Sequence, residues 1–486
     1  MKLLERVLDS AIRGMVNIDE MQFGFVPSKG TTDDIFIARQ LQEKYLAKEK
    51  KLYFAFVDLE KAFDRVPRSV LWWALRSLGV EEWAVQVIQG MYSNARSRVQ
   101  VNGQYSEEFG VKVGVHQGSV LSPLLFILVL EALSREFRTG TPWEFLYADD
   151  LIIIAESLEE CRRKLIRWRA EMKKKGLHVN LPKTKFMISG NGLVVLKDKG
   201  KYPCAVCRCG VGITNAILCT SCDHWVHGKV KCSGIKGGKV KGSNASDYVC
   251  LRCQGHESVP AIDGRPLTSV PLALDDVERE EADNHTASEE NVELEVVDEF
   301  CYLGDMFCAG GGCDRAIITR CSVAWGKFRK LLPILSSRQL PFSVRGRVFK
   351  ACVRSAMLHG GETWGPGTKE LQRLRRNDKA MVRWICGVKP QDENVTYEVL
   401  VAKLGLETIE MELADRRLRW YGHVMRSSDC IHDVFNLEVP GDRKCGRPRK
   451  SWYECVRGDI HDRGLGRVDP LDRVSWRRGV KYRAGT

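Results

Sequence analysis

Short apolar runs that end in carboxylates mark the first half of the chain. Residues 52–57 are apolar and β-favouring throughout, and Asp58 follows them directly. Farther along, the apolar segment 145–155 is interrupted only in its middle, where Asp149 and Asp150 are adjacent. This pattern predicts one buried strand that ends at a carboxylate, and a strand–turn–strand with two carboxylates at its tip.

Other segments carry the signals of helices and linkers. Residues 114–126 begin as a glycine-punctuated turn and continue as an apolar stretch with Pro123 near its start, which predicts a loop followed by a buried helix. Segments 315–332 and 344–357 repeat apolar residues at helical spacing and place Arg and Lys on their other faces. The acidic run 275–281 has the low apolar content of a disordered linker.

Composition narrows the class of protein. The 486 residues carry a net charge of +13, which suits a polyanionic partner, although charge alone is weak evidence. The length allows two to four domains. No apolar run is long enough to cross a membrane, and the N-terminus lacks the layout of a signal peptide, so we expect an intracellular protein without a membrane partner. In a reducing compartment, the 18 cysteines argue against a disulfide framework.

The paired carboxylates suggest metal chemistry. Burying two adjacent like charges is costly and raises a pKa, and a divalent cation such as Mg²⁺ removes both problems. Asp58 adds a third carboxylate at the end of a core strand, as a two-metal phosphoryl-transfer site requires. The alternative for Asp149 and Asp150 is an exposed turn in an ordinary hairpin.

Ordered motifs then resemble the palm of a reverse transcriptase, closest to those of non-LTR (LINE-type) retrotransposons. The order is Phe-Val-Asp-x-x-x-Ala-Phe-Asp at 56–64, Gln-Gly-Ser-x-Leu-Ser-Pro at 117–123 and Tyr-Ala-Asp-Asp at 147–150. The segments 22–27, 176–185 and 300–304 resemble further motifs of the same family, which lie before and after these three. Together these motifs extend across roughly the first 300 residues, so chance agreement is not a serious rival.

The resemblance implies an α+β fold with partial fingers and a palm at 1–190, and the palm end with a helical thumb at 299–385. It implies an RNA-directed DNA polymerase that uses two Mg²⁺ ions. The implied partners are an RNA template, a DNA primer or target DNA, and dNTPs. Nuclear localisation with a cytoplasmic ribonucleoprotein phase is implied as well.

Site residues carry over by the same resemblance. The catalytic Mg²⁺ ligands are expected to be Asp58, Asp149 and Asp150. Lys183 matches the lysine that protonates the departing pyrophosphate, with a merely solvated lysine as its alternative. The residues expected to contact the incoming nucleotide are Leu59, Phe63, Gln117 and Gly118. Phe63 matches an aromatic gate against the ribose 2′-hydroxyl, a role that is compatible with simple core packing, and Gln117 could instead be an ordinary turn amide.

A second cluster of residues predicts bound zinc. Segment 200–256 is rich in Gly and Lys and contains three Cys-x₂-Cys pairs, a His and a further Cys, which is a strong zinc signal in a segment too polar to fold on its own core. The order resembles a PHD finger, which implies interleaved ligation of two Zn²⁺ ions. The first ion would be held by Cys204, Cys207, His227 and Cys232, and the second by Cys219, Cys222, Cys250 and Cys253. Such fingers bind histone tails, but a zinc-stapled insertion without a ligand of its own, or one that contacts nucleic acid, is equally open.

The remaining segments complete the expected organisation. Residues 257–298 are expected to be an acidic, disordered linker, and 386–486 a helical, basic region that binds nucleic acid. Within that region, 416–423 interleaves basic and aromatic residues, which suits stacking and charge contacts with RNA. The segment 444–450 resembles an AT-hook core, with a basic loop or a nuclear-import signal as its alternative.

The chain also departs from the family pattern. It opens at a segment that resembles the middle of the fingers, and nothing in it resembles the earlier segment that grips the triphosphate or the endonuclease of such elements. We therefore expect an N-terminally truncated enzyme. The rival interpretation is a catalytically inactive or domesticated remnant that binds nucleic acid or chromatin.

Overall fold

A computed structural model describes most of the chain. The described residues are 2–190, 292–388, 395–441 and 449–481, with short strands at 201–203, 210–212, 216–218, 225–227 and 269–272. The chain divides into two compact units, Met1–Ser189 with Val270–Thr486 and, separately, Gly190–Ser269. The segment 444–450 lies outside the described residues except for Arg449 and Lys450.

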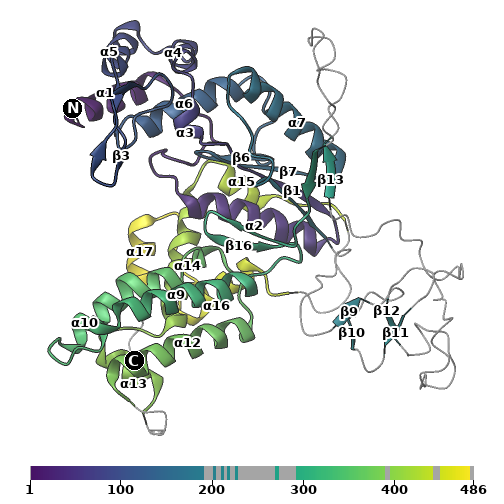
Figure 1. The fold of residues 1–486 in the computed structure, drawn as a ribbon. Coiled ribbons are helices and arrows are strands. Elements are labelled where there is room, and N and C mark those ends of the chain that lie inside the picture. The colour runs from purple at the N-terminus through teal and green to yellow at the C-terminus, as the bar shows by residue number, and fades with distance from the viewer. Residues whose placement is uncertain are drawn as a thin grey trace, which may run out of the picture. The chain divides into compact units, whose positions relative to one another are not determined.

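The larger unit is built on a four-stranded antiparallel sheet in the order β6-β7-β1-β8, called the central sheet below (Figure 1). Its strands are β1 (Leu52–Val57), β6 (Glu144–Tyr147), β7 (Asp150–Ala155) and β8 (Lys185–Ser189). The strand and the hairpin predicted from the apolar runs are therefore confirmed. Strand β1 lies inside the sheet, between β7 and β8, and its residues are almost all buried because both faces of the sheet are covered.

Alternating side chains divide this sheet between two cores. On one face, Ala55 and Val57 join the core that contains helices α6 (Ser122–Ser134) and α7 (Leu158–Lys174). On the other face, Phe54 and Phe56 join the core that contains α2 (Thr31–Ala47) and helices from the end of the chain. The two-residue period of a strand thus places helices on both sides of the sheet.

The region before and beside the sheet is mainly helical. Its elements are α1 (Lys2–Met15), α3 (Ala62–Arg65), α4 (Arg68–Ser77) and α5 (Glu82–Tyr92), followed by the short strands β2 (Arg96–Ser97), β3 (Gln100–Val101), β4 (Gln104–Tyr105) and β5 (Phe109–Gly110). The helix predicted after the glycine-rich loop is α6, which carries Pro in its first turn and is apolar on nearly all sides. Helix α6 is accordingly buried, as such a helix must be.

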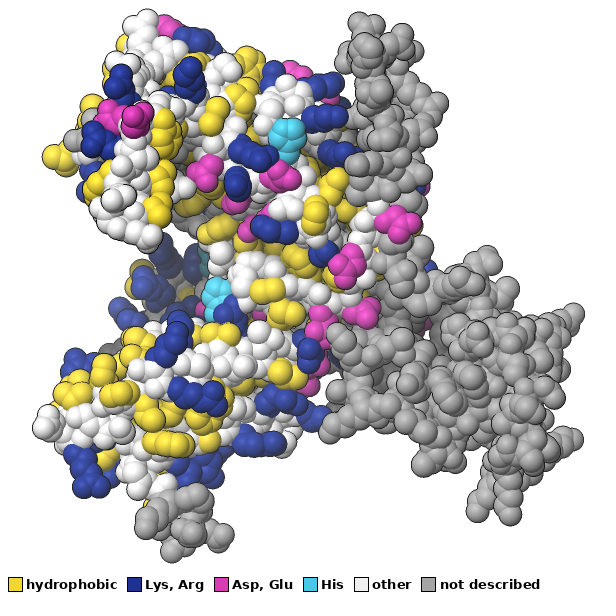
Figure 2. Space-filling view, viewed as in Figure 1, with side chains coloured by type: hydrophobic (Ala, Val, Ile, Leu, Met, Phe, Trp, Pro, Cys, Tyr) yellow, Lys and Arg dark blue, Asp and Glu magenta, His cyan; other side chains and the backbone are white. Residues whose placement is uncertain are grey.

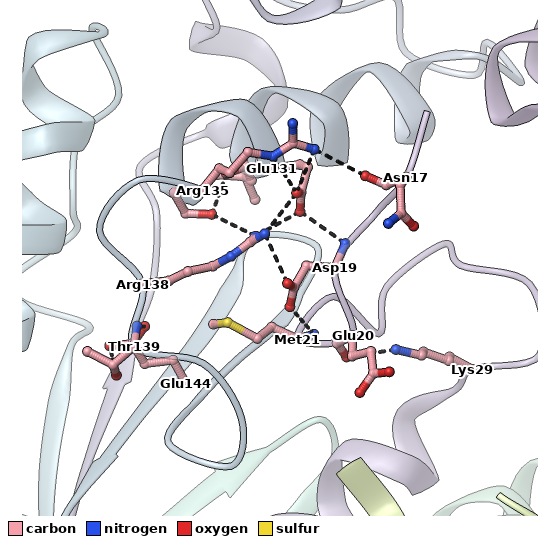
Figure 3. Close-up of polar contacts among 12 residues, drawn as sticks. Asn17, Asp19, Glu20, Met21, Lys29, Glu131, Arg135, Arg138, Thr139 and Glu144 are labelled. Carbon is pink, nitrogen blue, oxygen red and sulfur yellow. Dashed lines mark hydrogen bonds and ion pairs between the residues drawn. The ribbon is translucent and has the colours of Figure 1, made fainter. Parts of the chain in front are cut away.

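An ion cluster fastens the segment before α2 to the end of α6 (Figure 3). Glu131 of α6 accepts hydrogen bonds from Arg138 at 2.8 and 2.9 Å and from the backbone N–H of Asp19 at 3.2 Å. Arg138 also pairs with the Asp19 carboxylate at 3.0 Å. Burial alone would raise the pKa of Glu131, but the hydrogen bonds and charge of Arg138 lower it. The cluster fixes where residues 19–22 enter the central sheet region.

Helices dominate the last 190 residues. The hairpin β15 (Glu299–Tyr302) and β16 (Asp305–Cys308) comes first, with the turn Leu303–Gly304 in the left-handed region. The helices are α9 (Asp314–Leu335), α10 (Phe342–Val348), a π-helical turn (Phe349–Arg354), α11 (Ser355–Met357), a 3₁₀ turn (Gly361–Thr363), α12 (Thr368–Cys386), α13 (Tyr397–Lys403), α14 (Ile409–Arg426), α15 (Cys430–Asn436), α16 (Trp452–Asp462) and α17 (Arg473–Lys481). The helices predicted over 315–332 and 344–357 are present, the second interrupted by the π-helical turn.

A buried ion network holds these helices together. The Arg354 side chain is fully buried and donates two hydrogen bonds to Asp378 of α12, at 2.8 and 2.6 Å. Glu412 of α14 lies 3.3 Å from the same guanidinium, and the hydroxyl of Tyr397 donates to Asp378 at 2.6 Å. Because every buried charge here has a partner, the network joins α12, α13 and α14 without an orphaned ion.

The end of the chain, within the range 386–486 expected to be a basic nucleic-acid-binding region, packs into the core of the larger unit. Trp452 lies with its ring centroid 4.7 Å from that of Phe36 in α2. Within 416–423, Arg417 and Tyr421 are buried, and Arg417 pairs with Asp459 at 2.6 Å. Some of the alternating basic and aromatic residues therefore stabilise the fold, whereas Arg419 is exposed.

Little of the inserted segment is described. Its strands are β9 (Lys201–Pro203), β10 (Gly210–Gly212), β11 (Ala216–Leu218) and β12 (Trp225–His227), which pair as two antiparallel hairpins. The seven cysteines predicted to bind zinc lie outside the described residues, as does the side chain of His227. In the expected linker, β13 (Ser269–Leu272) pairs with β14 (Val292–Glu295), and Val270 and Leu294 are buried, so these two segments of the linker are ordered.

Candidate active site

Three carboxylates come together where two neighbouring strands end. Asp58 follows the last residue of β1, and Asp150 is the first residue of β7, with Asp149 in the turn before it. Strands β1 and β7 are paired so that Val57 lies opposite Leu151, which places Asp58 next to the β6–β7 turn. The sequence could predict each strand end, and the antiparallel register explains why the two ends meet.

The carboxylates repel one another in a partly buried site. Burial, followed by the charges of Asp149 and Asp58, raises the pKa of Asp150 to about 6. Burial and the charge of Asp58 also raise the pKa of Asp149. The Lys183 ammonium lowers both pKa values but does not reverse either shift. The site thus holds more negative charge than its own cations neutralise.

A third segment fastens Asp58 in place. The backbone carbonyl of Asp58 accepts a hydrogen bond from the N–H of Asn180 at 2.8 Å, and the Lys183 ammonium lies 3.3 Å from Asp58 Oδ2. Lys185, the other lysine of this motif, is instead engaged by the Pro182 carbonyl at 2.7 Å and by Glu295 at 2.8 Å. Of the two lysines, Lys183 is the one beside the carboxylates.

The β6–β7 turn has a strained backbone that one buried side chain supports. Ala148 has a φ of +57°, in the left-handed region that costs a residue with a Cβ about 1–2 kcal/mol. The side-chain oxygen of Gln22, which is 2% exposed, accepts hydrogen bonds from the N–H groups of Ala148 at 3.1 Å and Gly24 at 2.9 Å. A Cβ on Gly24 would lie only 2.3 Å from the Ala148 nitrogen. The motif at 22–27 was visible in the sequence, but this supporting role of Gln22 and Gly24 was not.

The expected gate residue lies between the site and the core. Phe63 is partly exposed, and its ring centroid is 4.4 Å from that of Phe126 in α6 and 6.5 Å from that of Phe25. One side of the ring therefore packs into the core. Its exposed side is available to a ligand, so the packing and gating roles are compatible.

The other residues expected at the nucleotide site differ in what they expose. Gln117 is exposed, and its amide nitrogen donates to Asp64 Oδ1 at 2.8 Å. Gly118 has a φ of +80°, and a Cβ added there would meet nothing within 4 Å, so its conformation, rather than contact within the protein, requires glycine. The Leu59 side chain is 4% exposed and packs in the core. A ligand could reach only the backbone of that residue.

A second acidic pair lies behind the turn, and sequence reasoning missed it. Asp34, at the start of α2, is fully buried and accepts a hydrogen bond from the Tyr302 hydroxyl at 2.9 Å. Burial raises its pKa to about 8, and the charge of Asp150 adds to the shift. The adjacent Asp33 lies 3.1 Å from His423 Nε2 of α14. At the sequence level the pair is indistinguishable from the acidic first turn of any helix.

The donor set fits a hard divalent cation. Oxygen ligands from Asp58, Asp149 and Asp150 are what Mg²⁺ prefers. Asp58 Oδ2 is shielded from solvent and, apart from its ion pair with Lys183, accepts no hydrogen bond within the described residues. Across that same part of the chain, no three Asp, Glu, His or Cys side chains already stand in a metal-ligand arrangement. The side chains of this site would therefore have to turn toward a common ion.

Comparisons with known proteins agree with the motifs. Residues 1–231 match the sequence family described as reverse transcriptase (RNA-dependent DNA polymerase). The Pol polyprotein of the type-2 retrotransposable element R2DM from Drosophila melanogaster is 29% identical over 204 residues, which are 40% of this chain and 18% of that polyprotein. The Pol polyprotein of a type-1 element R2 from Nasonia vitripennis is 29% identical over 36% of this chain and 18% of its own length. The RNA-directed DNA polymerase from the mobile element jockey of Drosophila funebris is 29% identical over 32% of this chain.

Residues 1–231 are thus similar to the reverse transcriptase family, and the similar curated proteins come from retrotransposable and mobile elements. The match spans about a fifth of the length of these curated relatives. In structure, a telomerase from Candida tropicalis is similar over 41% of each chain, with 18% identity and a TM-score of 0.32, which is too low to support an argument. No helix within the described ranges is both long and apolar enough to cross a membrane.

Proposed function

We propose that this chain is an RNA-directed DNA polymerase that extends a DNA primer on an RNA template. The observation that carries the proposal is the meeting of Asp58 with Asp149 and Asp150 at the ends of β1 and β7, inside a reverse transcriptase domain. Three carboxylates whose mutual repulsion is left uncompensated by nearby cations favour a metal-dependent reaction of phosphate esters.

The chemistry assigns a task to each group. In the reaction, the primer 3′-hydroxyl attacks the α-phosphorus of a dNTP, the bond to pyrophosphate breaks, and the hydroxyl proton is lost. Mg²⁺ held by Asp58, Asp149 and Asp150 would supply charge that activates the hydroxyl and stabilises the leaving group. Lys183, 3.3 Å from Asp58, stands beside these ligands as the donor of a proton to pyrophosphate.

Substrate selection falls to the neighbouring residues. The exposed side of Phe63 would clash with a ribose 2′-hydroxyl and so favour deoxynucleotides. Gln117 and Gly118 would line the nucleotide site, with Leu59 contributing its backbone. The hydrogen bond from the Gln117 amide to Asp64, at 2.8 Å, holds that amide beside the segment that carries Phe63.

The test compares two Asp→Asn variants in primer extension on an RNA template with Mg²⁺. Asp149→Asn should abolish extension while template binding persists, because most contacts with a duplex are made elsewhere. The control is Asp462→Asn, at an exposed position of α16, which should extend primers as the wild type does. Equal activity of wild type and Asp149→Asn would refute the assignment. If the wild-type chain binds RNA but extends nothing, the non-catalytic remnant becomes the better interpretation.

We also infer that the inserted segment binds two Zn²⁺ ions. Support comes from the spacing of its ligands in the sequence, with Cys204, Cys207, His227 and Cys232 in one set, and Cys219, Cys222, Cys250 and Cys253 in the other. A histone tail is the candidate ligand of this finger. The full chain should contain two zinc ions per molecule by elemental analysis, and Cys219→Ser should lower the content. A zinc content near zero after purification without chelators would overturn the inference.

A further inference from the structure

A basic pocket lies outside the carboxylate site. It has a volume of about 620 Å³ and is formed by helices α14 and α17 with the loop before α2. We call it the arginine pocket, and its lining residues are Ser28, Arg419, His423, Arg426, Arg473, Trp476 and Arg477. Figure 2 shows Lys and Arg side chains over α17 at the edge of a hollow in the face that it draws.

Helical spacing explains how the basic groups converge. Arg473 and Arg477 are four residues apart on α17, and Arg419, His423 and Arg426 follow one face of α14. The two helices approach closely at Gly422, where a Cβ would lie 2.5 Å from the Trp476 ring. The Trp476 side chain is 1% exposed, and its indole N–H donates to the Leu418 carbonyl at 2.9 Å. Helices α14 and α17 therefore both place basic side chains at the arginine pocket.

Nearby carboxylates neutralise the arginines of the pocket poorly. Among the ion pairs of the described residues, none involves Arg473 or Arg477, and both residues are exposed. Within the described ranges, the ion pair of Arg419 is with Asp415, at 3.9 Å, and Arg463 binds that carboxylate more closely. Partial burial, and then the charges of Arg473 and Arg477, lower the pKa of Arg426.

Geometry connects this pocket with the candidate active site. Gly24 packs against Ala148 in the β6–β7 turn, and the Phe25 ring lies near Phe63. Three residues later, Ser28 lines the arginine pocket. Three residues of chain span at most about 11 Å, so the arginine pocket begins within that distance of Phe25. The candidate active site lies next to Phe25, at the turn between β6 and β7 (Figure 1).

We propose that the arginine pocket binds the phosphate groups of a single-stranded nucleic acid as it passes the candidate active site. Arginine guanidinium groups suit phosphate oxygens because they donate in a bidentate fork and stay charged. The pocket offers no exposed aromatic ring for stacking, since Trp476 is buried, so we expect contacts with the backbone and no preference for sequence. We assign a nucleic-acid strand as the ligand, instead of a free phosphate compound, and this assignment rests on the proposed function.

The test removes two positive charges that take part in no ion pair among the described residues. The double variant Arg473→Gln, Arg477→Gln should bind a labelled 20-nucleotide single-stranded RNA roughly tenfold more weakly, measured by fluorescence anisotropy with EDTA present. If both arginines contact phosphates, the slope of log affinity against log salt should fall by about 1.4. The control is Arg457→Gln, Arg467→Gln, which removes two exposed arginines outside the pocket and the same net charge.

The outcomes distinguish a nucleic-acid strand from a free nucleotide as the ligand of the arginine pocket. Loss of RNA and single-stranded DNA binding in the pocket variant but not in the control supports the proposal. An equal loss in both variants would overturn it, since total charge would then be responsible. Unchanged strand binding with a loss of dTTP binding would overturn the strand assignment in favour of a nucleotide site. Because these assays need no catalysis, they succeed or fail independently of the Asp149→Asn experiment.

Discussion

Adding one methyl group at Gly24 should displace the turn that carries Asp149. The new Cβ of Gly24→Ala would lie 2.3 Å from the Ala148 nitrogen, 2.9 Å from the Tyr147 carbonyl carbon and 3.1 Å from the Ala148 Cα. Ordinary contact begins at 3.4 Å, so the turn must retreat by the difference, 1.1 Å. All three contacts are backbone atoms of the central sheet region, so none can yield by rotating a side chain.

A displacement of the β6–β7 turn by that distance should slow primer extension. Misplacing a catalytic group by about 1 Å costs on the order of 100-fold in rate, or about 2.7 kcal/mol of transition-state stabilisation. We expect kcat for primer extension on an RNA template to fall about 100-fold, with KM for the template nearly unchanged. The crowding itself should lower the free energy of unfolding by about 1–3 kcal/mol.

The matched control is Gly14→Ala in α1, where nothing lies within 4 Å of the added carbon. That variant should keep wild-type kcat and gain about 0.5–1 kcal/mol of stability, as alanine does in a helix. Urea unfolding and affinity for Mn²⁺, measured on both variants, separate a displaced carboxylate from a misfolded chain. If Gly24→Ala retained wild-type kcat and Mn²⁺ affinity, the reasoning from the turn geometry would be wrong.

Three further predictions concern other parts of the larger unit. Phe63→Val should raise ribonucleotide relative to deoxynucleotide incorporation by about 1–3 kcal/mol of discrimination, and an unchanged ratio in single-nucleotide extension would leave Phe63 a core residue only. Because the folded-state pKa of Asp150 is raised to about 6, its protonated form is favoured in the folded protein. Without metal, the unfolding free energy of wild type relative to Asp150→Asn should therefore fall as pH rises from about 4 to about 7, and parallel curves would contradict this. Arg354→Met should lower the unfolding free energy in urea by about 3–5 kcal/mol, since it leaves the Asp378 carboxylate buried and unpaired, and a loss below about 1 kcal/mol would show that the network is dispensable.

The sequence was most informative where polarity changes sharply along the chain. Asp58 and the pair at the β6–β7 turn interrupt apolar runs, so both the strands and the carboxylates at their ends could be predicted. The supporting contacts could not be, because they join residues far apart in sequence. Gln22 and Ala148 are 126 residues apart, and Tyr302 and Asp34 are 268 apart. Neither pair leaves a local pattern.

Basic residues near the end of the chain show the opposite difficulty. Arg417 and Arg419 are nearly adjacent and chemically identical, yet one is buried against Asp459 and the other is exposed at the arginine pocket. A helix with arginine on several sides has no single hydrophobic face from which to infer burial. The pattern of basic and aromatic residues therefore could not reveal which of these side chains pack internally and which stay exposed.

The packing of the last helices against α2 also delays completion of this core until late in protein synthesis. Phe36 and Phe56 form one core with Trp452 and Trp476, although roughly 400 residues separate the two groups along the chain. At 5–20 residues per second, a ribosome would need about 20–80 s to make the intervening chain. During that interval the core on this face of the central sheet lacks the side chains that the last helices contribute, so part of its aromatic surface is exposed to chaperones or to other nascent chains. The carboxylates are made early, but the scaffold behind them is finished only when translation is almost complete.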